Sequence, residues 1–106
     1  MKNNFKYHRL AEELQELLST VINEDIDGCD YVSITDVELT KDLQDAKVYF
    51  TSLEDKDKTL EILNQNIHML KNEIASRMKI RKIPNLIFKY DESLDNYNKI
   101  EALLEK

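Results

Sequence analysis

The stretch MKIRKIPNLIFKYDESL, residues 78–94, decides how the second half of the chain folds. It holds the only proline of the chain, Pro84, and then a short apolar run that ends at Tyr90. Because the residue before a proline disfavours helical geometry, a helix that enters this stretch must end by residue 82 or earlier. The run over residues 85–90 is then predicted to be the last strand of a sheet.

A long helical pattern leads into this stretch. Its apolar residues are spaced by three and four positions, and they are Leu60, Leu63, Ile67, Leu70, Ile74 and Met78. This spacing predicts a helix that runs through residue 80 with one buried face. Weaker helix formers at residues 64–68 predict a bend in it. Because the helix joins two strands, a right-handed crossover makes those strands parallel.

The first half of the chain predicts a helix followed by a hairpin. Apolar spacing favours an amphipathic helix over residues 4–23. Two β-rich segments, residues 31–39 and 46–51, flank a polar loop and are expected to pair as antiparallel strands. In the first of these strands the alternation of apolar and polar residues shifts by one position. This shift predicts a β-bulge near Thr35 and Asp36.

These elements make up one α+β domain over residues 1–106, since a chain of this length buries a single core. The predicted order is helix, strand, strand, long or broken helix, strand, with a short C-terminal helix that uses Ile100, Leu103 and Leu104. The strands form a three-stranded mixed sheet, and the helices lie on one of its faces.

The net charge of −6 hides an uneven distribution of charge. Residues 1–9 and 71–89 together hold 9 of the 15 basic residues and 1 of the 21 acidic ones. The basic residues are Lys2, Lys6, Arg9, Lys71, Arg77, Lys79, Arg81, Lys82 and Lys89. A solvated helix edge usually mixes Glu with Lys, whereas Glu73 is the only acid here. If the two segments meet, they form a positive face that suits a phosphate backbone, on an otherwise acidic body.

The chain offers no constellation for catalysis or for metal binding. Cys29 is its only cysteine, and His8 and His68 have no zinc-ligand spacing. The acidic loop at residues 25–30 fails the spacing of a calcium loop, and Gly28, the only glycine, cannot build a phosphate loop. We therefore expect a non-enzyme without a cofactor. With no apolar signal segment or membrane-length run, a cytoplasmic protein is expected.

Three segments together resemble the ribosome-binding factor A family: RLAEELQELLSTVI (9–22), ITDVELTKDLQDAKVYFT (34–51) and residues 78–94. This resemblance implies a type II KH-like fold with the element order given above. It implies binding to the small (30S) ribosomal subunit and its 16S ribosomal RNA during late maturation. It further implies assistance to rRNA processing, including adaptation to cold. The acidic body could meet ribosomal proteins or an assembly GTPase, and the sequence leaves this choice open. A monomer is expected.

The sequence departs from the family pattern at its kink. KH domains use a GxxG turn and the family an Ala-x-Gly kink, whereas Asn66, Ile67 and His68 stand here, and Tyr97 replaces a glycine before the last helix. Recognition by shape and phosphate is therefore expected rather than a KH-style grip on bases. The alternative function is a protein–protein adaptor that binds a partner through a sheet edge or an acidic helix.

Overall fold

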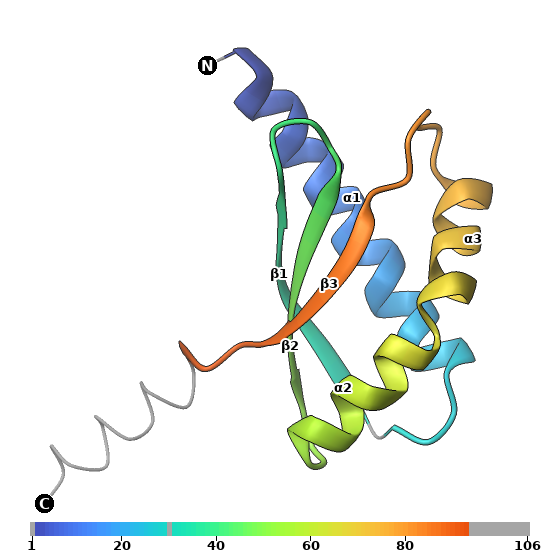
Figure 1. The fold of residues 1–106 in the computed structure, drawn as a ribbon. Helices are drawn as coiled ribbons and strands as arrows, with labels where there is room; N and C mark the ends of the chain where they lie inside the picture. Colours follow the sequence, from blue (N-terminus) through green and yellow to red (C-terminus); the bar gives the residue numbers. More distant parts are fainter. Residues whose placement is uncertain (1, 30, 94–106) are drawn as a thin grey trace, which may run out of the picture.

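The structure, a computed structural model, describes residues 2–29 and 31–93, with side chains from Tyr7 onward. Within these residues the elements follow the predicted order (Figure 1). They are α1 (Lys2–Asp25), β1 (Val32–Leu39), β2 (Asp45–Ser52), α2 (Lys56–Gln65), α3 (Ile67–Arg77) and β3 (Asn85–Tyr90). The predicted C-terminal helix lies outside the described residues.

The three strands form one mixed sheet in the order β1-β2-β3. β1 pairs with β2 in the antiparallel sense, and β2 pairs with β3 in the parallel sense that the crossover predicted. Ala46, Val48 and Phe50 of β2 are fully buried against the helices. Lys47 and Tyr49 alternate with them and are only partly buried. The described helices therefore cover one face of the sheet, and none of them lies on the other, which we call the open face (Figure 1).

Side chains of α1 occupy the outer edge of β1. The side-chain amide of Asn23 donates to the carbonyl oxygen of Val32 at 2.8 Å and accepts from its N–H at 2.9 Å. The amide of Gln15 donates to the carbonyl oxygen of Ile34 at 2.9 Å. These backbone groups point away from β2. Side chains of α1 therefore form the hydrogen bonds that a further strand would otherwise make with them.

The predicted bulge is present, because the pairing register of β1 shifts between Ile34 and Asp36. The extra residue, Thr35, donates its hydroxyl hydrogen bond to a carboxylate oxygen of Asp91 at 2.6 Å. Asp91 follows β3, and its N–H donates to the carbonyl oxygen of Phe50 at 2.8 Å. The bulge thus joins the first strand to the end of the last one.

Asp91 makes the stability of the protein depend on pH. Hydrogen bonds from Ser93 and then Thr35 hold the pKa of the Asp91 carboxyl below its ordinary value. A depressed carboxyl pKa stabilises the fold fully above the unfolded pKa of about 3.9 and ceases to do so as pH falls through the folded value. We expect the free energy of unfolding of wild type to fall more steeply below about pH 4 than that of Asp91→Asn. Urea unfolding over a pH series measures this, and parallel curves would contradict it.

The predicted bend is a break at Asn66, between α2 and α3. Asn66 has φ −107° and ψ 11°, and its N–H donates to the carbonyl oxygen of Leu63 at 3.1 Å. Its side-chain amide donates to the carbonyl oxygen of Ile62 at 2.8 Å. Since φ is negative and the side chain satisfies a terminal carbonyl, this break requires no glycine.

Replacing Asn66 with aspartate tests the role of its amide. The aspartate side chain has nearly the same shape but cannot donate to the Ile62 carbonyl when ionised. We expect Asn66→Asp to lower the free energy of unfolding by about 1 kcal/mol. Chemical denaturation measures the change, and Asn64→Asp on the exposed surface of α2 is the matched control. Equal losses in the two variants would show that the hydrogen bond contributes nothing.

The prediction of a helix through residue 80 is wrong, because α3 ends at Arg77. Met78 is extended, with φ −109° and ψ 140°, and is buried in the core. The extended backbone lets Met78, Ile80 and Ile83 all pack toward the core on the way to Pro84. Lys79 therefore belongs to the connection between α3 and β3 and not to a helix flank.

Candidate functional site

Three segments meet at one end of the molecule (Figure 1). They are the N-terminal half of α1, the loop between β1 and β2, and the connection over residues 78–84. The Tyr7 hydroxyl donates to the carbonyl oxygen of Lys41 at 2.6 Å and so fastens the loop to α1. The N–H of Thr40 closes the loop by donating to the carbonyl oxygen of Asp45 at 3.0 Å. Hydrogen bonds therefore fix the loop between β1 and β2 against α1.

An open groove of about 610 Å³ lies between these segments, and we call it the basic groove. Four of the predicted binding residues line it: Arg9, Lys79, Arg81 and Lys82. All four are exposed, and within the described part of the chain none has a carboxylate at ion-pair distance. The structure thus brings the basic N-terminal segment beside the basic connection, which the sequence left open.

Arg77 and Lys71 differ from this group because each has a partner. Arg77 forms an ion pair with Glu73, Nε to Oε2 at 3.4 Å, and lines a neighbouring hollow with Glu13 and Glu16. Lys71 donates from Nζ to the side-chain oxygen of Asn85 at 3.4 Å. Neighbouring carboxylates offset the charge of Arg77, so we expect it to attract an anion less than the groove residues do.

Lys89 is not among the residues that line the basic groove. Lys89 is opposite Tyr49 in the sheet register and faces the open side, since Leu86 and Phe88 face the core. Tyr49 itself has its pKa raised by burial and by hydrogen bonding to Glu38. Lys2 and Lys6 belong to α1, but their side chains lie outside the described residues.

The groove also holds residues that sequence reasoning missed. Leu10, Leu43 and Ile80 line it together with Glu13. Leu10 belongs to the segment predicted as an amphipathic helix, and Leu43 lies in the segment predicted as a polar loop. The backbone of Leu43 has φ 58°, a region that favours glycine, so nothing in the sequence announced its conformation.

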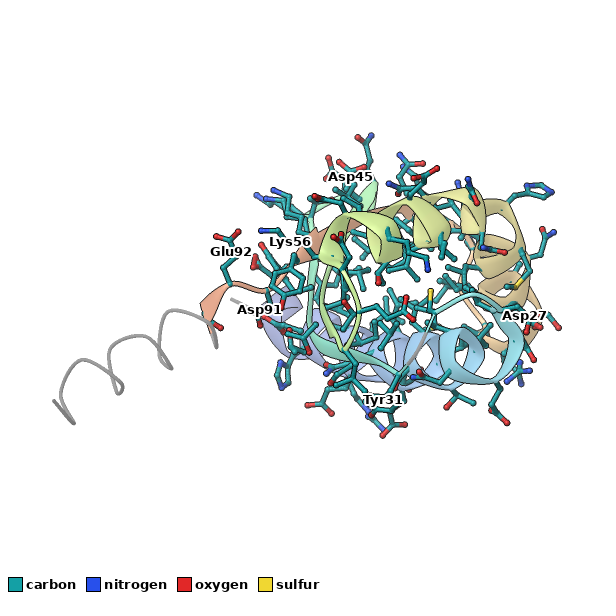
Figure 2. All side chains as sticks on the ribbon, turned by 90° about the horizontal axis from the view of Figure 1, so that it is seen from below. Asp27, Tyr31, Asp45, Lys56, Asp91 and Glu92 are labelled. Atoms are coloured by element: carbon teal, nitrogen blue, oxygen red, sulfur yellow. The ribbon has the colours of Figure 1, made fainter. Side chains whose placement is uncertain are left out.

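Acidic residues lie at the end of α1, on the loop that follows it and at the start of α2. Asp25 and Asp27 follow from the end of α1, while Asp55 and Asp57 stand at the start of α2. Figure 2, seen from below Figure 1, shows Asp27 on the loop after α1. Asp55 caps α2 by accepting from the N–H groups of Asp57 and Lys58 at 2.8 and 3.2 Å.

A salt bridge joins the start of α2 to the residues that follow β3. Lys56 Nζ lies 3.5 Å from Glu92 Oε1 and 5.5 Å from the centre of the Tyr90 ring (Figure 2). Both charged groups are exposed, so the contact contributes little to stability.

In the described ranges, no group of three or more His, Cys, Asp or Glu side chains is arranged to hold a metal ion. No helix there is long and apolar enough to cross a membrane.

A mixed sheet with helices on one face and a cationic groove at one end defines a small α+β binding protein. Residues 6–104 match the profile of the family described as ribosome-binding factor A, and the chain belongs to that family. Ribosome-binding factor A of Staphylococcus epidermidis is 38% identical over 109 residues, which cover 98% of this chain and 94% of the relative. The resemblance found in the sequence is thereby confirmed.

Two structures of family members share the fold. The crystal structure of ribosome-binding factor A from Thermus thermophilus has a TM-score of 0.77 at 23% identity, covering 81% of this chain and 96% of that one. A homology model of the Thermus thermophilus protein, fitted into a cryo-EM map of a 30S complex, has a TM-score of 0.69 at 23% identity. It covers 77% of this chain and 91% of that one. Both support the α+β architecture described above.

Proposed function

We propose that this protein binds the small (30S) ribosomal subunit during late maturation by placing its basic groove on the phosphates of 16S ribosomal RNA. One observation carries the proposal: Arg9, Lys79, Arg81 and Lys82 surround a single groove without an ion-pair partner among the described residues. A relative placed in a map of a 30S complex supports the choice of partner. Unpaired cations at one site release counterions from a phosphate backbone and so bind it.

The protein acts by binding and not by chemistry. A ligand that holds one conformation of the rRNA better than another raises the population of that conformation. Assistance to rRNA processing and to assembly in the cold then follows from the conformation that is held. No cofactor is needed for this, and one domain suffices. The acidic remainder of the chain limits non-specific contact with RNA and leaves a surface for a protein partner, for which an assembly GTPase in the cytoplasm is our candidate.

The adaptor alternative receives less support from the structure. A partner strand needs unpaired backbone groups at a sheet edge. Asn23 and Gln15 already occupy such groups at Val32 and Ile34 of β1. The edge of β1 at these residues is therefore closed to strand addition, and an adaptor would have to use β3 at the other edge of the sheet. The basic groove remains the better-supported binding surface.

Salt dependence tests the proposed contacts. The logarithm of the binding constant for small subunits should fall linearly with the logarithm of salt concentration. Neutralising Lys79 and Arg81 with glutamine removes two phosphate contacts, so the magnitude of the slope should fall by roughly 1.5 to 2. Filter binding or co-sedimentation over a salt series measures the slope.

Lys56→Gln with Lys58→Gln is the matched control. It removes the same charge from the start of α2, far along the chain from the groove, where both side chains are at least half exposed. The control should keep the wild-type slope. Equal slopes for wild type and the groove variant, or binding that survives nuclease digestion of the RNA, would exclude the proposed contact.

A further inference from the structure

The basic groove combines charge with an apolar floor. Leu10, Leu43 and Ile80 line it alongside four cations and one carboxylate, Glu13, which leaves a net charge of +3. A surface that binds a duplex backbone by charge needs no apolar floor, because its contacts are charge interactions and hydrogen bonds with phosphates and sugars. Unpaired nucleotides differ, since their exposed bases bury a flat apolar surface on binding.

We propose that the basic groove binds an unpaired RNA nucleotide, with its base against Leu43 and Ile80 and the flanking phosphates on the cationic rim. This inference rests on the proposed function and names the form of RNA that the same site takes. The guanidinium groups of Arg9 and Arg81 add planar surfaces on which a base stacks. The groove volume of about 610 Å³ is ample for one small ligand.

The conformation of Leu43 supports an apolar role for the β1–β2 loop. Its φ of 58° is uncommon for a bulky residue, and such residues cluster where a binding site is built. The N–H of Leu43 donates to the carbonyl oxygen of Thr40 at 2.9 Å, and Tyr7 holds the neighbouring Lys41 carbonyl. Glycine would adopt this φ without strain but would remove one wall of the groove.

The first test varies the RNA and leaves the protein intact, because both apolar side chains also serve the core. Ile80 packs against the core, and Leu43 lines a small cavity beside it. Wild-type protein is titrated at one salt concentration with three probes of equal phosphate number. They are a short single-stranded oligoribonucleotide of mixed sequence, a perfect RNA duplex of half that length, and an abasic ribose–phosphate chain of the full length. The single strand should bind about tenfold more tightly than either other probe, as expected for one stacked base.

The second test places that preference in the groove. Ile80→Ser should bring the affinity for the single strand to within about twofold of that for the abasic chain, because the apolar contact with the base is lost. The salt slope should stay unchanged, because the cations remain. Ile87→Ser is the matched control: Ile87 is 37% exposed on the open face of the sheet, and this variant should keep the wild-type preference.

Two results overturn the inference. One is equal affinity of wild type for the single strand and the abasic chain. The other is an Ile80→Ser variant that remains folded by thermal melting and keeps the tenfold preference of Ile87→Ser. If either occurs while small subunits still bind with the wild-type salt slope, the base site fails and the proposed function stands. If wild type binds neither the probes nor small subunits, both fail.

Discussion

Replacing Lys79, Arg81 and Lys82 with glutamate is expected to abolish co-sedimentation of the protein with small ribosomal subunits. All three side chains are exposed on the rim of the basic groove, and none has an ion-pair partner in the described structure. Each loses a charged hydrogen bond to phosphate of about 1.5 kcal/mol, so affinity should fall on the order of a thousandfold before repulsion is added. The fold should persist, because none of the three side chains is buried.

A second triple variant tests whether the position of the reversed charges matters or only the change in net charge. Replacing Lys47, Lys56 and Lys58 with glutamate changes the net charge by the same amount away from the groove. This control should still sediment with small subunits at physiological salt, and its circular dichroism should match that of the groove variant. Arg77→Glu should have a smaller effect than any groove reversal, because Arg77 is already paired with Glu73. Groove reversals that still co-sediment would contradict the site assignment.

Phe50→Ala is expected to cause the largest loss of stability. Phe50 is fully buried, and its ring makes edge-to-face contacts with Phe88 and Tyr90 at centroid distances of 6.4 and 5.6 Å. Truncation removes the ring and leaves a cavity between β2 and β3, which costs about 4 kcal/mol. Since domains of this size have a free energy of unfolding of about 5–15 kcal/mol, the variant should be close to unfolding at 37 °C.

Urea unfolding measures this loss, and Leu53→Ala provides the control. Leu53 is 79% exposed in the loop after β2, so its truncation should change the free energy of unfolding by less than about 0.5 kcal/mol. A loss below about 2 kcal/mol for Phe50→Ala would mean that the neighbouring rings collapse into the space.

Much of the fold was predictable because local signals coincided with the tertiary structure. Pro84 and the apolar run after it predicted β3 at residues 85–90, where the structure has it. The shift in the alternation of apolar residues predicted the bulge in β1, because an extra residue is needed to keep both sets of apolar side chains on one face. The end of α3 was not predictable in this way. Met78 continues the helical spacing but adopts an extended backbone, and only tertiary packing distinguishes the two.

The site was predictable in part. Charge counts identified the groove cations, but they could not separate unpaired cations from paired ones. A signal for Arg77 existed, since Glu73 lies four residues before it and such residues are neighbours on a helix. A sequence signal for Lys89 also existed, because side chains alternate along a strand and the burial of Leu86 and Phe88 places Lys89 on the opposite face of β3. The apolar floor depends on segments that are distant in sequence, and the positive φ of Leu43 has no local signal.

The contact between α1 and the edge of β1 bears on how the protein behaves in concentrated solution. Exposed edge strands recruit identical strands from other molecules and so begin aggregation. The amide of Asn23 meets Val32 as a strand would, with one donor and one acceptor. The helix thereby ends the sheet at its first strand, and at Val32 no backbone group remains to pair with a second copy.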